Sequence, residues 1–112
     1  MTTFLQPFTR PAVPSDRVLV RADGVRVYDS QGREYIDGLA SLWYCQVGHN
    51  RGEIIEAIHS QMNILATYNS FAPFSVEISE RAADRIADVS PFQNPRVFLC
   101  CSGSESIDTA LK

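Results

Sequence analysis

The residue types best suited to chemistry gather near the end of the chain, in Ser102-Gly103-Ser104-Glu105. The apolar run Val97–Cys101 before them is predicted to be a buried strand, and a helical pattern follows them. Ser102 and Glu105 have capping-box spacing, so the helix is expected to begin at Gly103. The first amides of a helix lack partners inside it and lie at the positive end of its dipole, and serine hydroxyls add donors. This pattern predicts an anion site, with an ordinary capped helix as the plainer alternative.

The preceding residues are predicted to form the elements that position this turn. Short alternating apolar runs between residues 18 and 36, separated by two glycine-containing turns, predict a three-stranded β-meander. Apolar residues at helical spacing predict an amphipathic helix over 51–66. A second helix is expected after Ser75, which would cap it, and its buried face would carry Ile78, Ala82 and Ile86.

This order of elements predicts the fold class α/β. A lone strand followed by a helix is the start of a parallel sheet, and Val97–Cys101 is apolar on both faces, as covered parallel strands are. Its parallel partners are absent from the sequence, which therefore resembles the front end of a larger α/β protein. Residues 1–16, rich in Pro and Thr, are expected to form an extended arm.

The composition excludes several classes of function. A formal net charge of -3 without a cluster of Lys and Arg argues against nucleic acid and against a membrane surface as partners. No apolar stretch approaches the ~20 residues that span a bilayer. The first 16 residues lack the basic flank and apolar core of a secretory signal.

The three cysteines point to a cytoplasmic protein with reduced thiols. Cys100 and Cys101 are adjacent, a pair that rarely forms a disulfide, and Cys45 leaves the count odd. We expect all three to be buried and reduced. His49 and His59 make no ligand pattern with them, so no metal site is predicted.

Four ordered segments of the sequence resemble the class III (omega) aminotransferases, which are pyridoxal-phosphate (PLP) enzymes of fold type I. The segments are DGVRVYDSQGREYID, GLASLWYCQVGHN, TYNSF and SGSESIDTALK, and the likeness extends from about Val18 to Lys112. The last segment is similar to the family's cofactor-phosphate motif. The resemblance implies that the chain is the N-terminal part of such a fold, with a small β-meander plus helices and then the first strand and helix of the large-domain parallel sheet. Residues 17–66 would be the small-domain segment and 67–112 the start of the PLP-binding large domain.

The resemblance also assigns site residues. Gly103 and Ser104 match positions that bind the cofactor phosphate through their main-chain amides and the Ser104 hydroxyl, and Ser102 matches the cap before them. Trp43 matches an aromatic residue that lines the substrate pocket. Phe71 matches a pocket residue that usually reaches the site of the partner subunit. A core aromatic remains the plainer alternative for Trp43, and a cover over a core edge for Phe71.

No catalytic residue is expected within the chain. In the family, the Schiff-base lysine and the acidic partner of the pyridine nitrogen both lie far beyond position 112, and Lys112 matches only a helix lysine of the phosphate motif. The 112-residue chain alone is therefore expected to be inactive.

The resemblance implies transfer of an amino group from an amine or amino acid donor to a keto acid or aldehyde, by a homodimer. The arm 1–16 and the loop 67–74 would be the interface elements of this piece, because their apolar residues fit an interaction surface. Two alternatives stay open. One is a non-catalytic fragment or remnant, and the other is an aminomutase, decarboxylase or racemase of the same fold.

Overall fold

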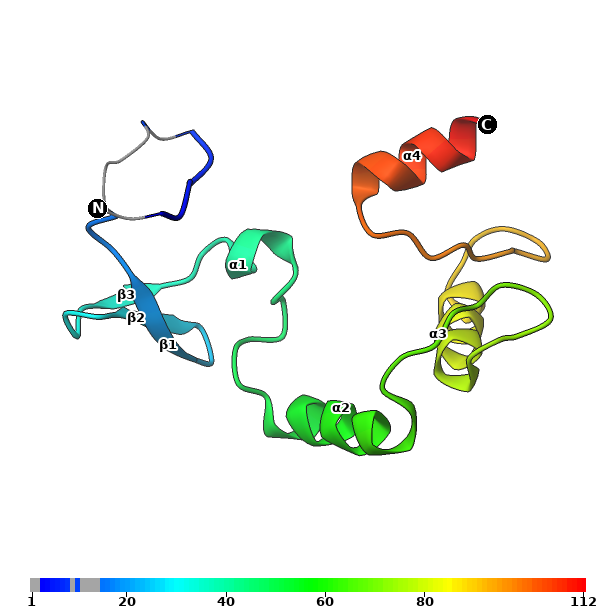
Figure 1. The fold of residues 1–112 in the computed structure, drawn as a ribbon, viewed down its shortest axis with the longest axis horizontal. Coiled ribbons are helices and arrows are strands. Elements are labelled where there is room, and N and C mark those ends of the chain that lie inside the picture. Colours follow the sequence, from blue (N-terminus) through cyan, green and yellow to red (C-terminus); the bar gives the residue numbers. More distant parts are fainter. Residues whose placement is uncertain (1–2, 9, 11–14) are drawn as a thin grey trace. The chain divides into compact units, whose positions relative to one another are not determined.

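The computed structural model describes residues 3–8, 10 and 15–112, and the chain divides into two compact units, Met1–Ile64 and Leu65–Lys112 (Figure 1). The elements in chain order are β1 (Leu19–Asp23), β2 (Arg26–Asp29), β3 (Glu34–Ile36), α1 (Ala40–Trp43), α2 (Gly52–Leu65), α3 (Glu77–Asp88) and α4 (Gly103–Leu111). No helix of the described residues is both long and apolar enough to cross a membrane.

The predicted β-meander is confirmed. Strands β1, β2 and β3 form one antiparallel sheet in that order, with Asp23 opposite Arg26 and Val27 opposite Tyr35. Gly24 has φ +53° in the tight turn between β1 and β2, a conformation that glycine adopts without steric cost. An ion pair between Arg26 and Glu34 adds a contact between the second and third strands.

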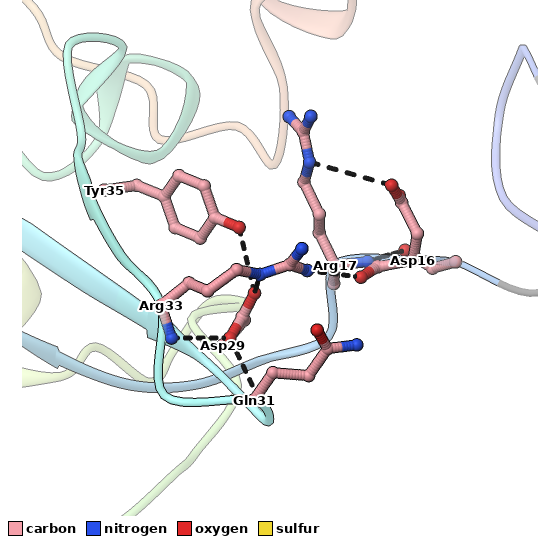
Figure 2. Close-up of polar contacts among 7 residues, drawn as sticks. Asp16, Arg17, Asp29, Gln31, Arg33 and Tyr35 are labelled. Carbon is pink, nitrogen blue, oxygen red and sulfur yellow. Dashed lines mark hydrogen bonds and ion pairs between the residues drawn. The ribbon is translucent and has the colours of Figure 1, made fainter.

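The turn between β2 and β3 is organised by the carboxylate of Asp29, which is only 2% exposed. Its Oδ1 accepts the backbone amides of Gln31 and Arg33, both at 2.9 Å, and its Oδ2 accepts Arg33 Nε at 2.6 Å and the Tyr35 hydroxyl at 2.9 Å. Figure 2 shows these contacts converging on one side chain. Burial raises the pKa of Asp29, but the hydrogen bonds from Arg33, Tyr35 and Gln31 outweigh it and lower the pKa to about 2.

Helices α2 and α3 form where the apolar periodicity predicts them, but two expectations about them are wrong. Val76, not Ser75, is the N-cap of α3, and no side chain caps that helix. The expected buried face of α3 is exposed, because no other described element packs against it: Ile78 is 38% and Ile86 47% exposed. The amphipathic pattern is present, but its apolar face is only partly covered in the described part of the chain.

The strand predicted at Val97–Cys101 is absent from the structure, where this segment runs irregularly into α4. A strand is defined by hydrogen bonds to a neighbouring strand, and the strands of the described residues all belong to the meander. The apolar sequence is thus typical of a covered strand, but it finds no parallel partner here: Phe98 is 76% and Leu99 54% exposed.

The buried interior of the described residues is small, consisting of Val76 and Asp29. The three cysteines are free, but the expectation that they are buried is wrong, since Cys45 and Cys100 are half-buried and Cys101 is exposed. Local hydrogen bonds, more than apolar packing, therefore define the backbone of each unit.

Candidate functional site

The N-terminus of α4 is built as the sequence predicts. Ser102 is the N-cap, with extended backbone (φ −152°, ψ 159°), and its hydroxyl oxygen accepts the amide of Glu105 at 3.2 Å. The Glu105 carboxylate reaches back to the amide of Cys101 at 3.0 Å, one residue before the cap. The hydroxyl of Ser106 donates to the carbonyl of Ser102 at 2.9 Å. These bonds fix the first turn and confirm that the helix begins at Gly103.

Three donors at this turn have no acceptor among the described residues: the amides of Gly103 and Ser104 and the hydroxyl of Ser104. They are the same three groups that the resemblance assigns to a phosphate. Gly103 also leaves room beside them, because a Cβ built there would meet no atom of the chain within 4 Å. Amides at a helix N-terminus and a serine hydroxyl suit a phosphate monoester, so the donor set fits the cofactor.

The acidic residues of α4 are already engaged, which reduces their competition with a bound anion. Glu105 accepts the Cys101 amide, and Asp108 Oδ2 lies 2.6 Å from Lys112 Nζ one turn further along. Lys112 is thus an exposed ion-pair partner of Asp108. No group of three or more His, Cys, Asp or Glu side chains able to hold a metal occurs in the described residues.

Trp43 lies in the other unit, at the end of the short turn α1. Residues 40–43 all have positive φ, with values of 47°, 49°, 64° and 80°, so the backbone makes one left-handed turn. The amide of Trp43 donates to the carbonyl of Leu39 at 2.9 Å, and the Trp43 side chain is 74% exposed. The described residues therefore leave most of the Trp43 side chain uncovered.

The carboxylate of Asp37 holds this left-handed turn. Its Oδ1 accepts the Leu39 amide at 3.2 Å, and its Oδ2 accepts the amide and hydroxyl of Ser41 at 2.8 and 3.2 Å. His49 Nε2 also lies 2.8 Å from Oδ2, and on its other side His49 Nδ1 lies 3.5 Å from Cys45 Sγ. The hydrogen bond from His49, followed by those from Ser41, lowers the pKa of Asp37 and keeps this group a carboxylate acceptor at neutral pH.

Phe71 lies in the loop between α2 and α3. The side chain of Asn69 accepts the Phe71 amide at 3.0 Å, and the Phe71 carbonyl accepts the amide of Phe74 at 2.9 Å. The rings of Tyr68 and Phe74 pack edge to face with centroids 5.6 Å apart. The Phe71 ring is not part of this aromatic pair, and Phe71 is 82% exposed.

The predicted site residues therefore fall into two groups. Ser102, Gly103 and Ser104 are brought together at one helix end, whereas Trp43 and Phe71 stand on separate turns. Sequence reasoning missed Asp37, although a local signal exists: an Asp that accepts the amide two residues ahead is a common turn device. Its contact with His49, twelve positions away, has no local signature.

Comparison with known proteins places this geometry in a family. A sequence profile of the family described as Aminotransferase class-III matches residues 8–112. The putrescine–pyruvate aminotransferase of Pseudomonas aeruginosa is 38% identical over 96 residues, which are 86% of this chain and 21% of that protein. The omega transaminase of Pseudomonas jessenii, solved in complex with PMP, is 32% identical with a TM-score of 0.86, over 96% of this chain and 24% of that one.

A further solved structure is also similar to this chain. It is a thermostable omega-transaminase variant, carrying one tryptophan-to-glycine substitution and engineered for asymmetric synthesis of enantiopure bulky amines. It is 31% identical with a TM-score of 0.87, over 96% of this chain and 25% of that one.

The architecture is that of the N-terminal part of a fold type I PLP-dependent transaminase. The chain belongs to the class III aminotransferase family. It spans about a fifth to a quarter of the length of the relatives it matches.

Proposed function

We propose that this chain is the N-terminal portion of an aminotransferase that transfers an amino group from an amine or amino acid donor to a keto acid or aldehyde, with PLP as cofactor. The observation that carries the proposal is the set of three unengaged donors on Gly103 and Ser104 in a chain of this family. The relative named for putrescine and pyruvate supports an amine donor and a keto acid acceptor.

The N-terminus of α4 would bind the phosphate of PLP. The amides of Gly103 and Ser104 and the Ser104 hydroxyl would donate to its oxygens, while Ser102 holds the first turn of the helix in place. When bound, PLP supplies an electron sink that stabilises negative charge at the substrate carbon bearing the amino group. The contribution of this chain is to hold and orient the cofactor, and no residue in it is assigned to proton transfer.

Trp43 and Phe71 would line the substrate pocket by apolar contact. Both side chains are largely exposed in this chain, as wall residues of an incompletely enclosed pocket would be. The transaminase variant that gained use with bulky amines carries a tryptophan-to-glycine change, which supports a tryptophan as a limit on amine size in this family.

The test is an activity assay on a full-length enzyme that contains this chain. With PLP, a panel of amines and pyruvate, it should form alanine, and Gly103→Val should lower the rate at limiting PLP because the valine branches enter the phosphate space. The 112-residue chain alone should show no turnover above a blank without protein. With amino acids added to the panel, loss of the amino acid's carboxyl group as CO₂, racemisation, or migration of its amino group within the molecule, each without transfer to pyruvate, would instead assign a decarboxylase, racemase or aminomutase of the same fold.

The full-length enzyme is further expected to be a cytoplasmic homodimer. The described apolar residues of the arm and loop are exposed, as an interface requires before assembly: Phe4, Leu5, Phe8, Phe71 and Phe74 range from 55% to 109% exposed. Residues 1–2, 9 and 11–14 of the predicted arm lie outside the described residues. Sedimentation velocity on Phe4→Ser and Phe71→Ser variants tests this expectation, since a dimer held by these segments should shift toward monomer.

A further inference from the structure

The left-handed turn at residues 40–43 requires a specific source of stabilisation. None of its residues is glycine, and for L-residues the left-handed helical conformation brings Cβ close to the following carbonyl oxygen. Four such residues in succession are costly, and single left-handed residues are the usual limit. Outliers of this kind persist where surrounding contacts determine the backbone, and they concentrate at functional sites.

Asp37 supplies those contacts at the start of the turn. Its carboxylate accepts the amide of Leu39 and both the amide and the hydroxyl of Ser41. Bonds to an ionised acceptor are stronger than neutral ones. The left-handed turn brings these donors to one point, so the carboxylate stabilises this conformation relative to an extended backbone.

Asp37 is itself fixed to the sheet. Its amide donates to the carbonyl of Val25 at 2.9 Å, and its Oδ2 lies 2.8 Å from His49 Nε2. His49 is in turn paired with Gly24 by two backbone hydrogen bonds, of 3.2 and 2.7 Å. Gly48 permits this approach, because a Cβ built there would lie 3.1 Å from the Gly24 carbonyl oxygen.

These contacts connect the β-meander to Trp43 through one carboxylate. The turn that begins at Asp37 ends at Trp43, whose carbonyl accepts the side-chain amide of Gln46. The Trp43 side chain is 74% exposed, so apolar packing in this chain contributes little to its placement. The backbone turn is what sets where the indole lies.

We propose that Asp37 is the positioning residue for Trp43: by holding the left-handed turn of residues 40–43, it sets the place of the indole and thereby the size of amine that the pocket accepts. The second half of this statement rests on the proposed function, and the first half does not.

Two readouts separate the halves. The first readout uses a full-length enzyme that contains this chain and in which every tryptophan outside it is replaced by phenylalanine. Trp43 is the only tryptophan of the 112 residues, so time-resolved fluorescence anisotropy then reports its local motion directly. Asp37→Asn keeps the shape of the side chain but removes its charge and replaces one carboxylate oxygen with an amide nitrogen, which cannot accept. In either orientation of the amide, the Leu39 amide on one side or the Ser41 donors on the other lose their acceptor. The matched control is Asp29→Asn, which weakens the other carboxylate network of the same unit without contacting the turn.

Asp37→Asn should increase the fast component of the anisotropy decay at a temperature where far-UV circular dichroism shows the enzyme folded. The equilibrium constant between the ordered and the open turn should fall by about tenfold or more, since the loss of a single bond to a charged acceptor already corresponds to about one order of magnitude. Asp29→Asn should lower the melting temperature and leave the anisotropy unchanged. Equal anisotropy in wild type and Asp37→Asn, or equal changes in both variants, would overturn the proposal.

Ser41→Ala serves if Asp37→Asn does not fold, because it removes one of the bonds to Asp37 and should give a smaller change in the same direction. In the full-length enzyme, Asp37→Asn should then shift the kcat/KM ratio of a bulky to a small amine toward the bulky one. A changed anisotropy with an unchanged ratio would support the positioning of Trp43 and remove Trp43 from the pocket. An unchanged anisotropy refutes the positioning whatever the ratio does.

Discussion

Replacing Ser104 with alanine should weaken the binding of PLP without weakening the fold. The Ser104 hydroxyl donates to no acceptor within the described residues, so its removal breaks no bond of the chain. Alanine also has a higher helix propensity than serine, and Ser104 is the second residue of α4. The melting temperature of the apoprotein should therefore stay the same or rise slightly.

The loss in affinity follows from the donor count. Ser104→Ala removes one of the three donors available to the phosphate and leaves the two amides in place. A hydrogen bond to a charged group is worth about 1.5–3 kcal/mol, which corresponds to a loss of about tenfold to about a hundredfold in affinity. The dissociation constant is measured by titrating PLP into the full-length apoenzyme.

The chain offers a matched control two residues further on. Ser106→Ala makes the same change in the same helix, but the Ser106 hydroxyl donates to the Ser102 carbonyl and is not available to a phosphate. It should leave PLP affinity near the wild-type value. An unchanged dissociation constant in Ser104→Ala, or equal losses in both variants, would restore the interpretation of this segment as a plain helix cap.

Three further outcomes are expected. Gly103→Val should weaken PLP binding more than Ser104→Ala does, measured by the same titration, because its Cβ substituents occupy the open space beside the donors and not space filled by the chain. Trp43→Ala should lower the free energy of unfolding by about 1 kcal/mol, because only about a quarter of the side chain is covered and full burial would give about 3–5 kcal/mol. The same substitution should raise the kcat/KM ratio of bulky to small amines by about tenfold or more. Denaturant unfolding and paired kinetics check this, and a large loss of stability with a constant ratio would contradict it. The pKa of Asp29 is lowered from 3.8 to about 2, so its stabilising contribution is complete above about pH 4 and is lost as the pH falls toward 2. The melting temperature should therefore depend less on pH in this range in Asp29→Asn than in the wild type.

The parts of the structure that the sequence predicts correctly are those governed by neighbours along the chain. The capping box at Ser102 and Glu105 needs only residues three apart, and the observed helix begins where that spacing places it. The meander follows from alternation and two glycine turns, and α2 follows from apolar periodicity. In each case the interacting groups lie within a few residues of one another.

Apart from the cap of α3, which is Val76 and not Ser75, the errors concern features that depend on distant groups. Val97–Cys101 has the composition of a covered strand, but only a neighbouring strand can make it one, and the described residues provide none. The face of α3 at Ile78 and Ile86 likewise has the right period and is only partly covered. Asp37 and His49 are twelve residues apart and meet because Gly24 pairs with His49, a contact that no local pattern encodes.

The two groups of proposed site residues are held in the same way. In each, polar contacts fix the backbone and leave the proposed functional groups exposed. At α4, Ser102 and Glu105 use their side chains on the cap and leave three donors of Gly103 and Ser104 unengaged. At α1, the Asp37 carboxylate holds the turn and leaves the Trp43 indole exposed. Since apolar packing within the chain supports neither group, substitutions of the outward groups should change binding and specificity while stability stays nearly constant. Substitutions of the same kind in a packed core would lower stability and function together. Measuring stability beside function therefore distinguishes binding-site residues from structural ones.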